Sequence, residues 1–332
     1  MKVGIIGCGL IGEKRASNLL DSKLYAVADL DSDKAQSFRR FNEELKIYSE
    51  WQDLLKDELI DIVIISTPNN YLTPIALEAI KSHKHILLEK PAGTSLEELK
   101  TLKELSESTG RVVKVGFNHR FHPGLIKAKE IVNSGALGDL MFIRGRYGHG
   151  GRVGYEKEWR ADPKISGGGE LIDQGVHLID LSRWFLGEFT QVNGVAHTYY
   201  WDMPVDDNCF LSLLNGKRQH AWLHVSCSEW KNMFSFEIYG RDGKIQIDGL
   251  GGTYGTEKIT YYKMLPEMGP PETTSWEYPM KDSSWELEYK NFLAAIVKSE
   301  DLCGSVNDAY EAMKIVKSVY MENGYDHNTK SS

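Results

Sequence analysis

Two short motifs carry side chains that can handle protons. Glu89-Lys90-Pro91 directly follows the apolar run His85–Leu88, and Asp173-Gln174-Gly175-Val176-His177 lies near the middle of the chain. A lysine ammonium can hold a reacting oxygen and stabilise negative charge that develops on it. An imidazole titrates near neutrality and can accept a proton. Together these groups can hold a reacting oxygen and accept a proton.

The spacing of the second motif predicts a polar stripe on a helix. Asp173, His177 and Asp180 are separated by four and three residues, so a helix puts them on one face. The apolar residues that can face a core are Ile172, Val176 and Ile179. Gly175 costs a helix about 1 kcal/mol, and close approach of another group would explain it. The alternatives are a solvated stripe and, for Lys90, an ordinary lysine at a strand end.

A glycine pattern opens the chain: Gly7-Cys8-Gly9-Leu10-Ile11-Gly12 follows a strand-like run and precedes a helical one. In this context Gly7 allows a tight turn, Gly9 lets the backbone approach a pyrophosphate, and Gly12 allows close helix packing. The N–H groups at the start of the helix attract phosphates. The alternative is a plain glycine turn.

An aspartate follows at the distance that this pattern requires. Asp29 comes directly after the strand predicted over 24–28, and its carboxylate can accept hydrogen bonds from ribose hydroxyls. It would repel a 2′-phosphate, and the next residues, Leu30 and Asp31, bring no cation. The sequence therefore predicts NAD as cofactor, with NADP disfavoured.

Strands and helices alternate through residues 1–120. Strands are predicted over 3–6, 24–28, 60–66, 85–88 and 112–117. Helices are predicted over 13–20, from Thr73-Pro74 with Thr73 as N-cap, and after the capping box of Ser95 and Glu98 as far as Gly110. Strands separated by helices indicate an α/β domain with a parallel, doubly wound Rossmann sheet.

The pattern differs over residues 121–325. Helices are predicted over 125–133, 171–186, 285–298 and 308–322, and a strand over 141–147. Asn215-Gly216 and Asp242-Gly243 separate β-branched runs, which is typical of hairpins. We expect an α+β domain with a large, mainly antiparallel open sheet, followed by a frayed tail over 326–332.

Composition limits the classes of function. The chain has 332 residues, 41% of them hydrophobic, and a net charge of −8, which disfavours nucleic acid or an acidic membrane as partner. It has no apolar run of the roughly 20 residues that a membrane span needs and no signal-peptide pattern. Its four cysteines are scattered, so we expect neither a disulfide framework nor a metal site. These features predict a cytoplasmic protein that acts on a small molecule.

The motifs, taken in order, resemble the glucose–fructose oxidoreductase/inositol dehydrogenase (Gfo/Idh/MocA) family along nearly the whole chain. In addition to the motifs already described, the resemblance rests on Ser66-Thr67-Pro68-Asn69, Gly116-Phe117-x-x-Arg120-Phe121 and Gly168-Gly169-x-Leu171. The resemblance implies a Rossmann domain, a second domain with an open antiparallel sheet, and hydride transfer between a sugar-type CHOH group and a nicotinamide. It also implies that Lys90, Asp173 and His177 are catalytic. Either Lys90 or His177 could be the base, and we favour His177.

The resemblance also gives a set of cofactor residues: Gly7, Gly9, Leu10, Ile11, Gly12, Asp29, Thr67, Pro68, Asn69, Glu89, Lys90 and Asn118. One departure concerns Leu72, which stands where many members have histidine, so any cofactor contact from that side chain is absent.

Substrate residues are expected partly in the connector between Arg144 and Arg160. The predicted set is Lys90, Arg120, Tyr147, Trp159, Arg160, Asp173 and His177. Aromatic faces stack on sugar rings, and arginines match phosphate or carboxylate. This combination hints at a sugar phosphate, uronate or nucleotide-linked sugar. A neutral sugar or cyclitol stays open, because long loops are often polar and rich in arginine.

Other functions remain as alternatives. An NAD-dependent glycosidase that oxidises, eliminates and re-reduces would accumulate no NADH, and a non-catalytic dinucleotide-binding regulator would have no need of Lys90, Asp173 and His177. No spacing supports a metal-dependent hydrolase. The resemblance further suggests a homodimer or homotetramer through the open sheet face, for which the alternating strands at 209–214 and 221–225 are suited.

Overall fold

The computed structural model describes residues 1–325 and divides into two compact units. Unit 1 consists of Met1–Asn118 together with Trp285–Glu311, and unit 2 consists of His119–Ser284 together with the segment that begins at Ala312. The predicted boundary at residue 120 assigns Trp285–Glu311 to the second domain, whereas this segment belongs to unit 1. The predicted fraying of the tail lies outside the described residues.

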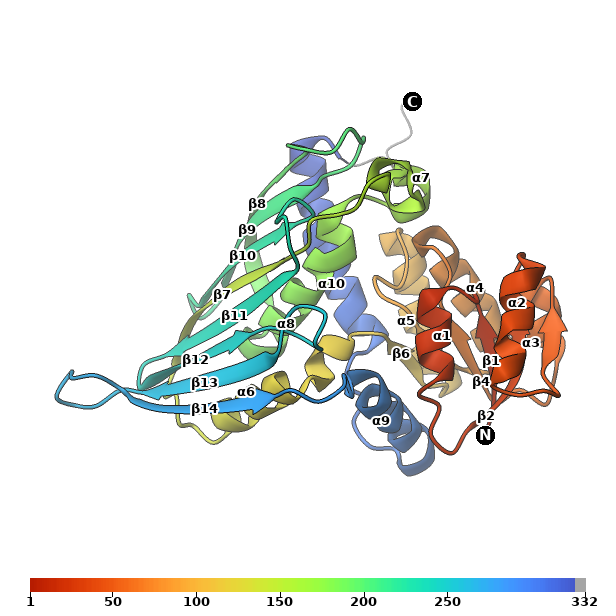
Figure 1. Cartoon of the computed structure of the whole chain (residues 1–332), viewed down its shortest axis with the longest axis horizontal. Coiled ribbons are helices and arrows are strands. Elements are labelled where there is room, and N and C mark those ends of the chain that lie inside the picture. Colours follow the sequence, from red (N-terminus) through yellow and green to blue (C-terminus); the bar gives the residue numbers. More distant parts are fainter. Residues whose placement is uncertain (326–332) are drawn as a thin grey trace. The chain divides into compact units, whose positions relative to one another are not determined.

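Unit 1 is built on a six-stranded sheet in the order β3-β2-β1-β4-β5-β6 (Figure 1). All five neighbouring pairs are parallel, which confirms the predicted Rossmann sheet. The strands are β1 (Lys2–Ile6), β2 (Lys23–Ala28), β3 (Lys46–Tyr48), β4 (Ile62–Ile65), β5 (His85–Leu88) and β6 (Val113–Val115). Because the four residues of β4 are buried on both faces, this strand shows no polar alternation.

In the described part of the chain, five helices of unit 1 lie between these strands, and a sixth, α9, follows β14 (Glu272–Tyr278). They are α1 (Leu10–Ala16), α2 (Ser32–Ser37), α3 (Trp51–Lys56), α4 (Asn69–Lys81), α5 (Leu96–Thr109) and α9 (Ser284–Lys298). The predicted caps of α5 are confirmed: Ser95 Oγ accepts from the Glu98 N–H at 3.3 Å, and Gly110 ends the helix with φ +65°. Tyr289 and Phe292 of α9 join the core around Val3 and Ile5, which explains why this late segment belongs to unit 1.

The predicted start of α4 is wrong. The helix begins at Asn69 rather than at Thr73, so Pro74 lies inside it. Thr73 does not cap the helix, because its hydroxyl donates to the Ala92 carbonyl at 2.6 Å. The Thr73-Pro74 pair has the sequence of a helix start, but the Thr73 hydroxyl is bonded to Ala92, which is distant in sequence.

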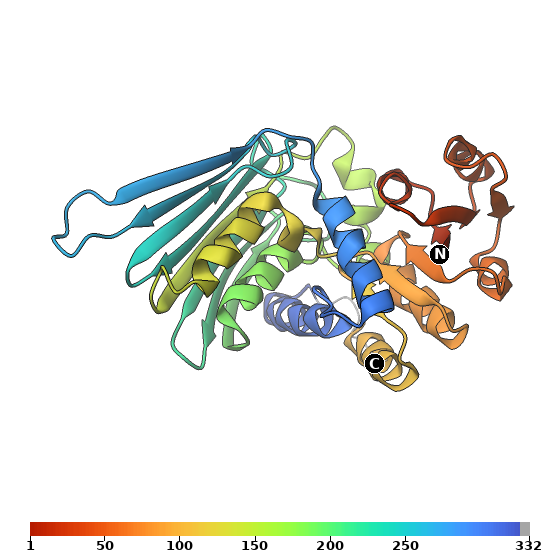
Figure 2. The same cartoon turned by 90° about the horizontal axis from the view of Figure 1, so that it is seen from below.

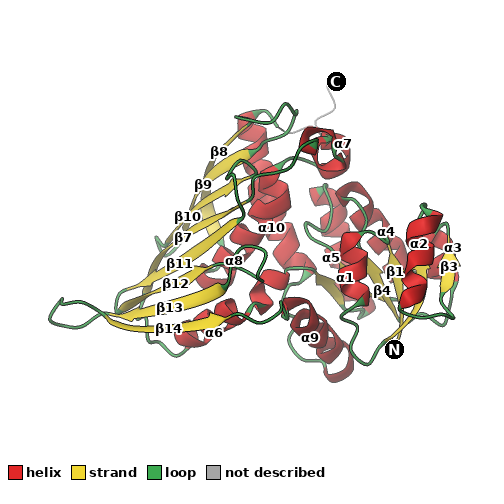
Figure 3. Cartoon of the chain, in the orientation of Figure 1, coloured by secondary structure: helices red, strands yellow, loops and turns green. Residues whose placement is uncertain are grey.

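Unit 2 contains an eight-stranded sheet in the order β14-β13-β12-β11-β7-β10-β9-β8 (Figure 3). The strands are β7 (Leu140–Gly148), β8 (Phe189–His197), β9 (Asn208–Asn215), β10 (His220–Ser226), β11 (Met233–Gly240), β12 (Gly243–Asp248), β13 (Glu257–Lys263) and β14 (Glu272–Tyr278). Every neighbouring pair is antiparallel except β7 with β10. The predicted, mainly antiparallel sheet is confirmed.

Helices cover one face of this sheet. They include α6 (Pro123–Asn133) and α8 (Val176–Leu186). The other helices of this region are the short α7 (Pro163–Ser166), which contacts residues 159–161, and α10 (Val306–Asn323). Figure 2 shows α6 and α8 side by side along that face, and α6 contacts β13 while α8 contacts β7 and β10. Exposure alternates along β9 to β12, as expected for a sheet with one covered face.

The helix predicted over 171–186 has two parts. Leu171–Gly175 is a π-helix, and the α-helix α8 begins only at Val176. The predicted single α-helix is therefore wrong over 171–175, where Asp173 lies in the π-helix and His177 lies in α8. Short π segments occur frequently at functional sites, and this one carries a predicted catalytic residue.

Candidate functional site

The glycine turn of unit 1 is shaped by close backbone contacts. Gly7 has φ +95°, and a Cβ there would lie 2.6 Å from the Ser66 carbonyl oxygen. A Cβ on Gly12 would clash with the Gly7 carbonyl, so both glycines are required by packing. Around Gly9, in contrast, no described atom lies within 4 Å of the point that a Cβ would occupy. The protein itself leaves space there, as a bound pyrophosphate requires.

Asp29 supports this turn directly. Its carboxylate accepts from the N–H of Cys8 at 2.6 Å and from that of Asp31 at 2.9 Å. Burial and the Asp29 charge raise the pKa of the Cys8 thiol to about 12, so this cysteine stays protonated in the turn. Asp29 therefore also holds the glycine turn in place, a role that its spacing in the sequence does not predict.

Two polar atoms beyond β4 are buried without partners. Thr67 Oγ1 and Asn70 Oδ1 have no hydrogen-bond partner within residues 1–325. Buried polar groups are nearly always satisfied, so a bound ligand is a natural partner. Together with the space at Gly9 and the position of Asp29, these atoms fit a dinucleotide. Leu72 is fully buried in α4.

The loop that carries Lys90 is anchored on both sides. The Lys90–Pro91 peptide is cis, and the Thr73 hydroxyl bonds to Ala92. Glu89 is buried and accepts from Arg15 Nε at 2.7 Å. This ion pair gives Glu89 a structural role beside Lys90, and its contact with the cofactor stays a prediction.

Arg15 also joins this loop to α9. Its Nη1 lies 2.5 Å from Glu288 Oε2, and both side chains are almost fully buried. Burial raises the pKa of Glu89 and the Glu288 charge adds to the shift, while Arg15 opposes it. A Cβ on Gly116 would lie 2.7 Å from Arg15 Nη2, which explains the glycine before Phe117.

In unit 2, a buried carboxylate and a tyrosine hold the segment that carries Asp173 and His177. Asp206 accepts from the N–H groups of Gly169 at 2.9 Å and Leu171 at 2.8 Å, and from the Tyr320 hydroxyl at 2.6 Å. The same hydroxyl accepts from Gly169 and Ile172. Burial raises the pKa of Asp206 even though these hydrogen bonds lower it.

The same contacts explain the run Gly167-Gly168-Gly169. A Cβ on Gly168, which has φ +154°, would collide with the Tyr320 ring, and a Cβ on Gly169 would collide with the Asp206 backbone. Gly175 is also a packing glycine, because its Cβ would lie 2.9 Å from Leu171 Cδ1 and 3.4 Å from Val225 Cγ2. The group whose close approach the sequence suggested is thus part of the protein core.

His177 lies in a buried aromatic cluster. Its ring is stacked on that of His119, with centroids 3.7 Å apart and planes 17° apart, and Tyr147 packs edge-on at 6.3 Å. The pKa of Tyr147 is well above its usual range because of burial, with further contributions from Tyr254, Asp173 and Glu170. Tyr147 therefore stays neutral and can donate a hydrogen bond.

Asp173 pairs with a predicted substrate residue. Arg160 Nε donates to Asp173 Oδ2 at 3.1 Å, and the Arg160 guanidinium also lies 4.6 Å from the Trp159 ring centroid. The structure thus brings Asp173, Arg160 and Trp159 together. It also places Tyr147 beside His177, as described above.

Arg120 does not fit its predicted role in substrate binding. It is 6% exposed and binds Asp180 through both Nε, at 2.8 Å, and Nη2, at 2.5 Å. This bidentate ion pair fixes the start of unit 2 to α8. It also removes Asp180 from the predicted polar stripe.

Sequence reasoning missed four residues of this region: His119, Asp206, Tyr254 and Tyr320. His119 stands between the predicted Asn118 and Arg120, and a histidine next to a predicted site is a signal that could have been used. The other three reach the site from more than 30 positions away, and nothing in their local sequence marks them.

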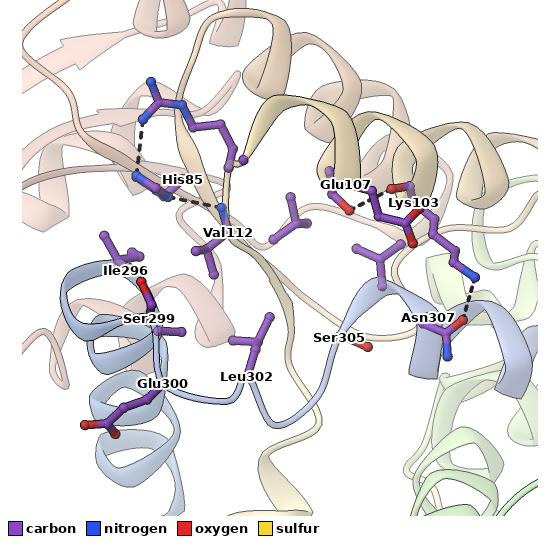
Figure 4. Close-up of a pocket in the computed structure, with 16 residues that line it drawn as sticks. His85, Lys103, Glu107, Val112, Ile296, Ser299, Glu300, Leu302, Ser305 and Asn307 are labelled. Carbon is purple, nitrogen blue, oxygen red and sulfur yellow. Dashed lines mark hydrogen bonds between the residues drawn. The ribbon is translucent and has the colours of Figure 1, made fainter.

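Unit 1 also has a pocket of about 460 Å³, shown in Figure 4. Its lining includes His85, Arg111, Val113, Lys103 and Asn307. His85 and Val113 are the first residues of β5 and β6. The pocket therefore lies at the amino-terminal ends of these parallel strands, whereas the glycine turn and Lys90 follow the carboxyl-terminal ends of their strands. No predicted site residue lines it.

The predicted site residues are divided between the units. All the predicted cofactor residues and Lys90 belong to unit 1, whereas Arg120, Tyr147, Trp159, Arg160, Asp173 and His177 belong to unit 2. Groups of three or more histidine, cysteine and acidic side chains arranged for a metal ion are not found among the described residues. Within residues 1–325 no helix is long and apolar enough to span a membrane.

The sheet order, the open glycine turn and Asp29 define a dinucleotide-binding protein with a second, α+β unit. Comparison with known families agrees: the oxidoreductase family with an NAD-binding Rossmann fold matches residues 1–117, and the GFO/IDH/MocA C-terminal domain matches residues 125–246. The chain belongs to the Gfo/Idh/MocA family of oxidoreductases, and its cofactor is NAD.

Several relatives have names that describe an activity. Levoglucosan dehydrogenase of Pseudarthrobacter phenanthrenivorans is 30% identical, with 74% of this chain and 73% of the relative covered. Inositol 2-dehydrogenase of Rubrobacter xylanophilus is 31% identical, with coverage of 75% and 72%. Among solved structures, levoglucosan dehydrogenase in complex with NADH has the same fold, with a TM-score of 0.85, 24% identity and coverage of 97% and 98%.

Proposed function

We propose that this oxidoreductase converts a secondary alcohol of a sugar or cyclitol to a ketone. The carbon loses a hydride, the hydroxyl loses a proton, and a carbonyl is formed. Bound NAD supplies the acceptor for the hydride and becomes NADH. The named activities of the levoglucosan and inositol dehydrogenases support this substrate class.

Each proposed catalytic residue has a distinct task. His177 accepts the hydroxyl proton. Lys90 donates a hydrogen bond to the reacting oxygen and stabilises its developing negative charge. Asp173 orients the substrate or the Arg160 side chain that it binds at 3.1 Å.

The observation that carries this proposal is the fixed, buried setting of His177. The ring is 4% exposed and is held in one plane by His119 at 3.7 Å. A base in a defined orientation away from bulk water needs little reorganisation to take a proton.

The ion pairs of the connector favour a neutral substrate over an anionic one. Arg144 lies 2.9 Å from Glu237, Arg152 lies 2.6 Å from Glu158, and Arg160 binds Asp173. These arginines are already neutralised by carboxylates, so a phosphate or carboxylate on the substrate would have to compete with them. We therefore place neutral sugars and cyclitols ahead of sugar phosphates, uronates and nucleotide-linked sugars.

The test is a screen with NAD that follows the absorbance of NADH. The panel contains levoglucosan, myo-inositol, free aldoses, sugar phosphates, uronates and a nucleotide-linked sugar. We expect NADH to accumulate with at least one neutral member. Cleavage of glycosides without net NADH would indicate the glycosidase alternative, and NAD binding without turnover of any member would indicate the regulator.

We also propose that the chain is a homo-oligomer. The face of the eight-stranded sheet opposite to α6 and α8 exposes Val195 at 54%, Phe210 at 40% and Trp222 at 60%. Val195 pairs with Phe210, and the Phe210 ring stacks on His224, two residues from Trp222, so large side chains share this face across β8, β9 and β10. Contiguous apolar surface of this kind usually marks an interface. The proposed cellular location is cytoplasmic.

A further inference from the structure

A cluster of exposed aromatic rings in unit 2 has no part in the function described so far. We define the aromatic platform as Tyr200, Trp201 and Trp230. Trp230 is 77% exposed and Tyr200 is 56% exposed, whereas Trp201 is half-buried. Large rings with this exposure, gathered in one place, suggest a binding surface.

The platform lies at the same end of the sheet as the candidate substrate residues. His197 at the end of β8 pairs with Asn208, which pairs with Ser226 at the end of β10, which pairs with Gly148 at the end of β7. Loops 198–207, 227–232 and 149–162 therefore leave the sheet together. The first two carry the platform, and the third carries Trp159 and Arg160.

A line of ring contacts connects the platform to the candidate site. The ring centroids of Trp230 and Tyr200 are 5.2 Å apart, those of Tyr200 and Trp201 are 5.2 Å apart, and those of Trp201 and Tyr155 are 5.5 Å apart. The ring centroids of Tyr155 and His149 are 5.5 Å apart, and His149 Nε2 lies 3.6 Å from Glu170 Oε1. Glu170 directly precedes the π-helix that carries Asp173, so the inner end of the line reaches this segment.

The backbone of the platform is fixed by buried groups. The Asp207 carboxylate accepts from three consecutive N–H groups, those of Tyr199 at 2.8 Å, Tyr200 at 2.7 Å and Trp201 at 3.0 Å. Asp207 itself is fully buried. Trp201 Nε1 donates to the Cys227 carbonyl at 2.8 Å, which ties the two loops together. Rings held in place before binding lose little conformational entropy when a ligand arrives.

Trp230 has an unfavourable backbone conformation. Its φ of +61° is unusual for a bulky residue. A Cβ on Gly150 would lie 3.1 Å from the Trp230 carbonyl carbon, so the glycine lets the loops approach. The exposed indole gains no core packing in return, and a bound ligand would account for its position.

We propose that the aromatic platform binds a second sugar ring, so that the substrate is a neutral glycoside or oligosaccharide oxidised on the ring next to Asp173 and His177. This inference rests on the proposed function. The faces of aromatic rings are electron-rich and attract the polarised C–H groups on the flat side of a sugar. Such binding needs no charge on the sugar. This agrees with the connector, where Arg152 and Arg160 are already paired with carboxylates.

The test compares binding of disaccharides and monosaccharides by enzyme saturated with NADH. Titrations use maltose, cellobiose, levoglucosan, myo-inositol and UDP-glucose. The proteins are the wild type, Trp230→Ala, Tyr200→Ala and the control Met268→Ala, whose side chain is 83% exposed in the β13–β14 loop. We expect both platform variants to weaken disaccharide binding about tenfold and to leave monosaccharide binding unchanged. The control should bind both as the wild type does.

Several results would overturn the inference: no disaccharide binding by the wild type, equal losses for both sugar classes, or no loss in either platform variant. If the loss appears only with a nucleotide-linked sugar such as UDP-glucose, the platform holds a base instead. If Trp230→Ala changes the mass of the oligomer, the platform is a contact between subunits and not a sugar site. Failure of the proposed function is separate, since it would appear as absence of NADH formation from every sugar while the binding difference persists.

Discussion

At the residue scale, Tyr320 shows how a single hydroxyl can hold a functional segment. It donates to Asp206 and accepts from the N–H groups of Gly169 and Ile172, all buried. Tyr320→Phe keeps the ring but leaves these groups short of a partner. We expect a loss of about 1–3 kcal/mol in the free energy of unfolding, measured by urea denaturation.

The matched control is Tyr261→Phe, whose exposed hydroxyl donates to the Ala136 carbonyl at 3.0 Å. Water can replace this bond, so a loss below about 0.5 kcal/mol is expected. Equal losses in the two variants would show that the Tyr320 hydroxyl has no special role.

A second residue-scale prediction concerns pH and His85. Burial lowers the pKa of His85 and the Arg111 charge adds to the shift, and His85 Nδ1 accepts from the Val112 N–H at 3.1 Å. Because the folded pKa is below the unfolded value of about 6.5, the unfolded chain binds a proton more readily. This contribution to stability is present above about pH 6.5 and is lost as the pH falls.

His85→Asn keeps an acceptor but cannot titrate. The difference in unfolding free energy between about pH 8 and pH 5 should therefore be smaller in this variant than in the wild type. His83→Asn, at an exposed position two residues earlier, is the control and should behave as the wild type does. A pH dependence that is the same in His85→Asn and wild type would contradict the assignment.

At the element scale, the π-helix over Leu171–Gly175 depends on Gly175. An alanine there would gain about 1 kcal/mol in helix propensity, but its Cβ would lie 2.9 Å from Leu171 Cδ1, which is fully buried. We expect a net loss of about 1–3 kcal/mol from overpacking. The readout is again urea denaturation.

Gly216→Ala provides the comparison, because no described atom lies within 4 Å of its Cβ position and its φ is not positive. We expect this variant to stay within about 0.5 kcal/mol of the wild type. A Gly175→Ala protein as stable as Gly216→Ala would mean that the segment can relax around the methyl group.

Local patterns predicted most elements but not their exact form. Buried β-branched runs and the Ser95 cap identified β4 and α5, because these depend on neighbours in sequence. The predicted start of α4 and the predicted α-helical form of 171–175 were wrong. Thr73 bonds to Ala92, and Gly175 packs close to Val225, and both partners are distant in sequence. The sequence singled out His177 as a candidate, but it predicted neither His119 as its stacking partner nor the ion pairs of Glu89 and Arg120.

At the scale of the whole molecule, the open face of the eight-stranded sheet predicts self-association. Trp222→Asp puts a carboxylate in the middle of this face, and burial of an unpaired charge in an interface is costly. We expect the mass measured by light scattering to fall to that of one chain. Met268→Asp, on an exposed loop, should keep the oligomer. A wild type that is monomeric would contradict the proposed interface.

Two of the three proposed catalytic residues, Lys90 and His177, come from different units, so the proposal that they cooperate concerns the whole protein. If Lys90 and His177 act on one hydroxyl group, neither can work well without the other. Their effects on the rate should then be strongly non-additive, as found for groups that act as a unit.

The most direct test is therefore kcat for Lys90→Met, His177→Ala and the double variant with a sugar identified by the screen, with NAD affinity measured separately. We predict that each single change lowers kcat by about 10²–10⁴, that the double variant is scarcely slower than the poorer single variant, and that His177→Ala still binds NAD. A double variant whose loss equals the product of the two single losses, or single variants with nearly normal turnover, would contradict the account.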